Sequence, residues 1–226
     1  MAVGYDTEAT NLTGSGLSIT IGNNPGRCLF AIVSAQGDKD DPCSIAGVSG
    51  GGGGAWTQVA AVAVNTANVA AALAIWRSTA PATGAQTITP SFAGNVGDAQ
   101  LALVSLFGVD QASPIAGSAT NSGTGTAVSV ALSSTTNNYL LEGAITDNGA
   151  STITGSGVGT LIQKGTGANY LADYGHGRKL STGGSQSSSW TLAVSKAWAD
   201  VAVSVAEGFP AIARQSFPEP ALAGWF

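Results

Sequence analysis

Charge, cysteine and histidine are all scarce in this sequence of 226 residues. Asp, Glu, Lys and Arg make up 9% of the chain, there are two cysteines, and His176 is the single histidine. Globular domains typically carry about 25% charged residues. The eight basic residues are scattered, so no basic patch is available to neutralise phosphates, and we expect no nucleic-acid partner.

Long apolar runs are missing too. No stretch approaches the ~18 unbroken apolar residues of a membrane span, so we expect no membrane partner. The first ten residues contain acids but no basic cluster with an apolar core behind it, so we expect no secretory signal and folding in the cytosol. Cys28 and Cys43 are too few for a disulfide framework. They are expected to be small buried thiols, although they could also face each other across neighbouring strands.

Small and β-branched residues dominate what is present. Hydrophobic residues make up 44% of the chain, glycines number 32, and apolar and polar residues alternate with a period of two between turn residues. The pattern predicts strands at 17–21, 27–36, 44–49, 56–64, 69–77, 86–92, 99–109, 126–134, 138–146, 160–163, 169–175, 188–194 and 199–207, with a loop at 116–125. This is typical of tightly packed β-structure with a neutral, hydroxyl-rich surface.

Two segments decide the fold class. Residues 27–36 form a nearly continuous apolar run, as expected for a strand that is buried on both faces. Residues 59–73 are rich in alanine, but their valines and the central Asn65–Asn68 favour a hairpin over a helix. We therefore predict an all-β, jelly-roll-type sandwich of about a dozen antiparallel strands in two sheets packed face to face.

The last residues differ from the domain before them. We divide the chain into an N-terminal extended segment (1–14), a β-sandwich (15–207) and an extended C-terminal arm (208–226). The arm holds three of the eight prolines, which favour an extended path and deny a strand its hydrogen-bond donors. Its large apolar side chains need a partner surface. The predicted partner-binding residues are Phe209, Phe217, Leu222, Trp225 and Phe226.

Candidate catalytic residues are weak. Gly47–Gly51 matches G-x-S-x-G, but Ser49 leads into five glycines, which cannot begin the helix that a hydrolase nucleophile needs. His176 would have to serve any Ser-His-Asp triad or histidine metal site, and its glycine neighbours predict an exposed loop. We predict no catalytic residue and no enzyme activity.

Candidate ligand sites are weak as well. Asp38, Asp40 and Asp41 could offer oxygens to calcium, but without the EF-hand spacing they read as a solvated turn. Glycines 50–54 lack the Lys-Ser/Thr of a phosphate-binding loop, so we expect a flexible loop or a close approach of two backbones. We predict no metal and no cofactor.

Tryptophan leaves one alternative open. Trp56, Trp76, Trp190 and Trp198 lie in or beside predicted strands, where they are expected to pack in the core or at its rim. Exposed, the same rings could stack on sugars, with help from the segments around 38–54 and 174–184.

Four segments carry a resemblance to a known family. They are Gly22–Arg27, Ala74–Arg77 followed by Ala80–Gly84, Ser105–Gln111 with Pro114, and Ser188–Val205, and Phe-Gly-Val-Asp-Gln at 107–111 is the most specific. Over about residues 15–206 the chain resembles uncharacterised jelly-roll, lectin-like β-sandwich domains of tailed-phage virion proteins and bacterial surface proteins. The resemblance implies a structural or binding domain and brings no catalytic residues.

From these features we expect a non-enzymatic virion structural protein, assembled in the host cytoplasm. A capsid decoration (cement) protein or a tail component fits best, with major capsid or tail subunits, or further copies of the chain, as partners. The alternative is a carbohydrate-binding or adhesin domain.

Overall fold

The computed structural model describes residues 2–37, 43–66, 69–146, 152–155, 159–166 and 173–208, and these form β-strands, turns and bends. In chain order the strands are β1 (Gly4–Asn11), β2 (Leu17–Ile21), β3 (Cys28–Gly37), β4 (Ser44–Gly50), β5 (Thr57–Thr66), β6 (Val69–Thr79), β7 (Gly84–Ala93), β8 (Val96–Phe107), β9 (Ile115–Thr146), β10 (Ile153–Gly155), β11 (Thr160–Thr166) and β12 (Asp173–Val205). A search of the described residues for helices long and apolar enough to span a membrane finds none.

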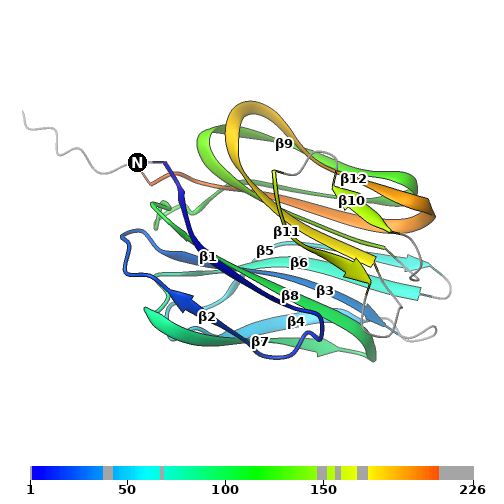
Figure 1. Ribbon diagram of the computed structural model, residues 1–226, viewed down its shortest axis with the longest axis horizontal. Coiled ribbons are helices and arrows are strands. Elements are labelled where there is room, and N and C mark those ends of the chain that lie inside the picture. Colours follow the sequence, from blue (N-terminus) through cyan, green and yellow to red (C-terminus); the bar gives the residue numbers. More distant parts are fainter. Residues whose placement is uncertain are drawn as a thin grey trace, which may run out of the picture.

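The strands form antiparallel sheets that pack into a β-sandwich, which confirms the predicted fold class. The central sheet has the order β1-β8-β3-β6-β5. A sheet of β2, β7 and β4 covers one of its faces, and β9, β12, β10 and β11 cover the other (Figure 1). The prediction of two sheets was therefore wrong in number, because three sheets are stacked.

The central sheet is buried on both faces, as the apolar run at 27–36 predicted. Along β3, Cys28, Phe30 and Ile32 point into the cluster shared with β9 and β12. Leu29, Ala31 and Val33 point the other way, into the cluster shared with β2 and β7. Because successive side chains of a strand point to opposite faces, a strand in this place has to be apolar on both faces along most of its length.

β9 and β12 are each far longer than any predicted strand. Residues 174–191 of β12 pair with 145–127 of β9. Residues 196–205 pair with 125–115, and 198–205 pair with 146–139 as well. Two separate pairings of the same two strands require the ribbon to bend back over itself, as its curled end in Figure 1 shows. The predicted loop at 116–125 was wrong, because this segment is part of β9.

The folded-back part of the ribbon forms a further layer with its own core. Val128, Val130 and Leu132 of β9 and Trp190 and Leu192 of β12 are buried there. They share two clusters with Leu140, Ala144, Trp198 and Ala202 from the part of the ribbon beneath them. The predicted strands 126–134 and 138–146 are thus two arms of one long strand, β9.

The hairpin predicted at 59–73 is confirmed. β5 and β6 pair antiparallel, with Thr66 opposite Val69 at the turn end. At the N-terminus, β1 pairs with β8 along Gly4–Asn11, so most of the predicted extended segment 1–14 is an edge strand of the central sheet. Arg178 ties β1 to β12, since its Nε lies 2.7 Å from Glu8 Oε2 and its guanidinium lies 3.7 Å from the centre of the Tyr5 ring.

Segments that carry the family resemblance meet at one end of the sandwich. The Gly108 N–H donates to the Pro25 carbonyl, and the Val109 N–H donates to that of Gly26, both at 3.0 Å. Val109 also forms an antiparallel bridge with Glu207. The most specific motif is therefore a structural closure, which joins the loop before β3 to the end of β12.

At glycines 50–54 two backbone segments approach each other closely, which is one of the two alternatives that the sequence left open. Gly50 has φ +93°, and a Cβ there would collide with the Thr87 carbonyl oxygen. The Gly54 N–H donates to the Thr79 carbonyl oxygen at 3.2 Å, so the run also binds the end of β6.

We predict that Gly50→Ala costs about 2–4 kcal/mol of unfolding free energy, from a strained φ and from the collision with Thr87. Gly84→Ala is the matched control. Gly84 also has a positive φ (+82°), but nothing lies within 4 Å of its added Cβ. Gly84→Ala should therefore cost only the strain of the positive φ, about 1 kcal/mol of unfolding free energy. Denaturant titrations of both variants measure the difference, and equal losses would contradict the close-approach interpretation.

Candidate functional site

A group of polar side chains lies between the central sheet and the sheet of β9 and β12. We call it the inter-sheet cluster, and its members are Ser34, Gln36, Asp98, Gln100, Tyr174 and His176. Ser34 of β3 lies opposite Gln100 of β8, and Gln36 lies opposite Asp98. These four continue the face of β3 and β8 that carries Phe30 and Val104, so the sequence places polar groups where the apolar core ends.

His176 is the centre of this cluster and is fully buried. The prediction of an exposed loop was therefore wrong. A hydrogen bond of 2.8 Å joins His176 Nε2 to Ser34 Oγ, and the Tyr174 ring stacks at 6.2 Å between centroids. Burial lowers the pKa of His176 to about 3, so the imidazole is neutral at physiological pH.

The inter-sheet cluster can hold a neutral polar group. His176 Nδ1 and Gln36 Oε1 are buried and have no hydrogen-bond partner among the described residues. Buried polar atoms are normally satisfied by protein or by ordered water, so these two atoms can accept a hydrogen bond from, or donate one to, such a group. Burial raises the pKa of Tyr174, and Asp98 and Asp173 raise it further, so its phenol stays protonated.

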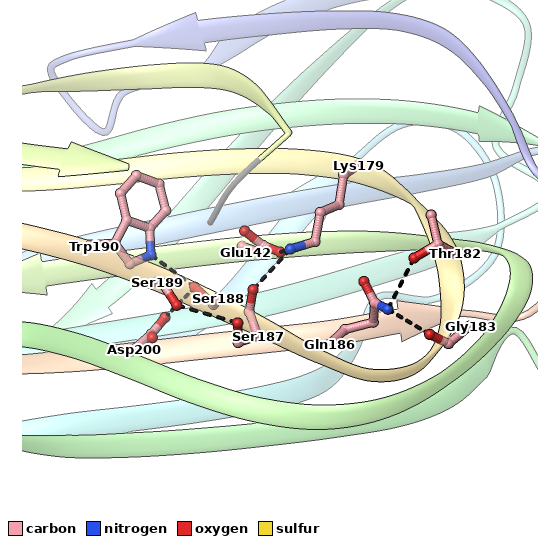
Figure 2. Close-up of polar contacts among 10 residues, drawn as sticks. All are labelled: Glu142, Lys179, Thr182, Gly183, Gln186, Ser187, Ser188, Ser189, Trp190 and Asp200. Carbon is pink, nitrogen blue, oxygen red and sulfur yellow. Dashed lines mark hydrogen bonds and ion pairs between the residues drawn. The ribbon is translucent and has the colours of Figure 1, made fainter. Parts of the chain in front are cut away.

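A second polar group lies inside the folded-back ribbon, and we call it the ribbon cluster. Its members are Glu142, Lys179, Ser188, Trp190 and Asp200, shown in Figure 2. Lys179 Nζ lies 2.9 Å from Glu142 Oε1 and donates to the Ser187 carbonyl oxygen at 2.8 Å. The Trp190 indole donates to Ser188 Oγ, which in turn donates to Asp200 Oδ1 at 2.9 Å.

Both carboxyl groups of the ribbon cluster are fully buried. Burial raises the pKa of Glu142 to about 7, and the contact with Lys179 opposes this shift. Burial raises the pKa of Asp200 to about 8, where the hydrogen bond from Ser188 opposes it and the charge of Glu142 reinforces it. Near neutral pH both groups are therefore proton-binding sites inside the protein.

The structure separates the two residues of the hydrolase candidate. Ser49 is exposed at the end of β4 in the three-stranded sheet, where its Oγ donates to the Thr89 carbonyl oxygen. His176 lies beyond the central sheet, paired with Ser34 instead. A hydrogen-bonded Ser-His pair therefore does exist in this chain, but its serine is Ser34, which no sequence motif indicated.

The tryptophans divide into two kinds. Trp190 and Trp198 are buried in the ribbon, 1% and 7% exposed, so neither presents a face to a sugar. Trp56 and Trp76 are partly buried against the cluster under the three-stranded sheet, and the Trp56 indole donates to the Gly50 carbonyl oxygen. The segment 174–184, expected to be a loop near a sugar, is part of β12.

Cys28 and Cys43 are buried thiols in different clusters and form no disulfide with each other, as the first of the two readings predicted. Burial raises the pKa of Cys28 to about 12, which keeps its thiol protonated. Among the described residues, no group of three or more His, Cys, Asp or Glu side chains could hold a metal ion. The calcium candidates Asp38, Asp40 and Asp41 lie outside the described residues.

The predicted partner-binding residues Phe209, Phe217, Leu222, Trp225 and Phe226 also lie outside the described residues. The structure does show where this segment begins. The Gly208 N–H donates to the Gly108 carbonyl oxygen at 2.7 Å, at the closed end of the sandwich. An open groove beside it is lined by residues of β9, by Asp110 and Ser113 of the preceding turn, and by Ala206 and Glu207.

Comparisons of the chain with family models, curated proteins and solved structures find no match. The resemblance to phage and bacterial sandwich domains therefore stays a prediction.

We predict that Ser34→Ala costs about 1–3 kcal/mol of unfolding free energy, because His176 Nε2 then loses its partner inside the protein. Ser49→Ala is the control, since it removes an exposed hydroxyl and is expected to change stability by less than about 0.5 kcal/mol. Chemical denaturation of the two variants checks the difference, and a neutral Ser34→Ala would mean that water replaces the hydroxyl without cost.

Asp200 gives a prediction with a definite sign. Its pKa is raised from 3.8 to about 8 on folding, so the folded state binds the proton more tightly, and its stabilising contribution is lost as pH rises through this range. Asp200→Asn should therefore gain stability relative to wild type between pH 4 and 8. Ser188→Ala keeps the carboxyl group and should keep the wild-type slope. Unfolding free energies measured across this range test both, and parallel curves for wild type and Asp200→Asn would contradict the prediction.

Proposed function

We propose that this chain is a non-enzymatic structural subunit of a virion, a capsid decoration protein or a tail component. It docks on neighbouring subunits through the surface of its sandwich and through the segment 209–226. The proposal rests on how the described domain is closed, on the chemistry of its surface and on the composition of the last eighteen residues.

The closure of the sandwich is the observation that carries the proposal. β12 ends at Val205, the Asp110 N–H donates to the Ala206 carbonyl oxygen, and Glu207 bridges to Val109. The strand positions in all three sheets are filled by elements that end at or before Val205. The sheets therefore need no strand from 209–226, and this supports a role for its four large aromatic residues at another surface.

Surface chemistry supports the same proposal. The exposed residues of β9 include a row of hydroxyl side chains on alternating positions: Ser118, Thr120, Ser122, Thr124 and Thr126. Charged groups are depleted at the centres of protein interfaces because removing them from water is costly. A neutral, hydroxyl-rich sheet face avoids most of this cost, so it suits contacts that are made once and kept.

The groove beside Glu207 is a second feature of the docking end. Its lining includes the apolar residues Ile115 and Ala116 and the polar residues Thr136 and Asn138. Segment 209–226 begins two residues after Glu207 in the sequence, so we expect the groove and the anchors to contact the same neighbouring subunit. Among the tryptophans of the described residues, only Trp56 and Trp76 have partly exposed rings that the carbohydrate-binding alternative could use.

We predict that a chain ending at Gly208 folds with wild-type thermal stability but no longer joins the assembly. The expected cause is the loss of Phe217, Trp225 and Phe226, since anchors of this kind contribute about 2 kcal/mol or more each. Native mass measurement and binding to purified particles, with circular dichroism to check folding, compare the two chains.

Leu180→Ser in the full chain is the control, because it removes an exposed apolar side chain of the ribbon and leaves the anchors in place. If the shortened chain assembles with wild-type occupancy, the docking role of the segment is wrong. If the full chain instead binds glycans on an array and particles not at all, the carbohydrate-binding alternative replaces the proposal.

A further inference from the structure

Glu142 and Lys179 lie on the paired strands β9 and β12, and their side chains point to the same face of the sheet. Glu142 of β9 lies opposite Gly177 of β12, and Lys179 lies opposite Leu140, so the two residues are diagonal neighbours. Figure 2 shows the two side chains converging under the folded-back layer. Nζ and Oε1 are 2.9 Å apart, with side-chain exposures of 17% for Lys179 and 0% for Glu142.

An ion pair is expensive in this place. Removing two charges from water is offset only when every lone pair and proton finds a partner. Here Nζ contacts Glu142 Oε1 and donates to the Ser187 carbonyl oxygen, but Glu142 Oε2 has no hydrogen-bond partner among the described residues. A neutral pair, with the proton moved from nitrogen to oxygen, avoids both charges. Burial raises the pKa of Glu142 to about 7, so its carboxyl group can take up a proton near neutral pH.

The neutral pair is also the reactive pair. A neutral amine is a nucleophile, and a neutral carboxylic acid is an electrophile that loses water more readily than a carboxylate. The Ser187 carbonyl oxygen holds Nζ at 2.8 Å, and the sheet register fixes both backbones. Groups held in contact in this way react with effective concentrations of about 10⁵ M or more when their geometry matches the reaction.

We propose that Lys179 and Glu142 are joined by an intramolecular amide bond between Nζ and Cδ. The ammonium first gives a proton to the carboxylate. The nitrogen lone pair then attacks Cδ, the bond from Cδ to one carboxyl oxygen breaks, and that oxygen leaves as water with the carboxyl proton and a second proton from nitrogen. No oxidant, reductant or added group is needed, and the remaining amide N–H can still donate to the Ser187 carbonyl oxygen.

The bond would clamp the two longest strands. It links residue 142 of β9 to residue 179 of β12 across their turn end, so the chain between them becomes a closed loop. A cross-link of this kind stabilises the native state mainly by restricting the unfolded chain. It goes beyond the proposed function, because the bond stands or falls whether or not the chain is part of a virion.

Intact mass of the purified, denatured full chain tests the bond. We expect wild type to be lighter than its sequence by one water, and Lys179→Arg, which keeps the positive charge, to show its full sequence mass. Lys196→Arg is the matched control on the same strand and should lose the water as wild type does.

Trypsin mapping locates the bond without any variant. In wild type, cleavage after Lys179 should be blocked, and peptide 78–164 should be found joined to peptide 179–196. Full sequence mass for wild type, with free cleavage after Lys179, would overturn the proposal and leave a buried ion pair in its place. A lost water located at any other residue pair would overturn it equally.

Discussion

Burial of the central sheet on both faces is the constraint on which the rest of this structure depends. β3 and β8 are buried at nearly every position and are mostly apolar, so neither face of the sheet is stable in water. One covering sheet would leave half of this surface exposed. The three-stranded sheet and the ribbon of β9 and β12 are therefore both required. Each of them forms its main apolar cluster together with the central sheet.

The same constraint explains where the polar groups are. The ribbon covers the central sheet with one face, and its other face would be open to solvent if the ribbon did not fold back. Folding back buries Trp190 and Leu192, but it also encloses Glu142 and Asp200 from the strips beneath. Their burial is a cost of the fourth layer, which hydrogen bonds from Ser188 and contact with Lys179 partly offset.

The sequence predicted the fold best for strands whose burial follows one pattern along their whole length. The apolar run at 27–36 indicated burial on both faces, and the valines of 59–73 indicated a hairpin, because each depends on periodicity alone. The length of β9 could not be predicted, since Gly117, Gly123 and Gly125 and many hydroxyl residues are also typical of loops. Their strand state depends on pairing with residues more than seventy positions away.

His176 shows why the buried clusters were missed. Its glycine neighbours suggested a turn, but a Cβ at Gly175 would collide with the Trp190 ring, so this glycine marks close packing between layers. Glu142 did carry a signal, as a lone acid in the apolar run Leu140–Ile145, and Asp200 did so between Trp198 and Val201. Such an acid indicates a buried carboxyl group, but only the fold shows that both face the same interior.

The double pairing of β12 also gives the domain a direction of mechanical strength. Residues 198–205 have β9 on both sides, with 139–146 along one edge and 115–123 along the other. A force that pulls on Gly208 runs along the axis of this strand. It would have to shear two rows of backbone hydrogen bonds at once instead of opening them one by one. A pull on Gly208 is thus resisted by the hydrogen bonds of β12 to both neighbouring segments of β9.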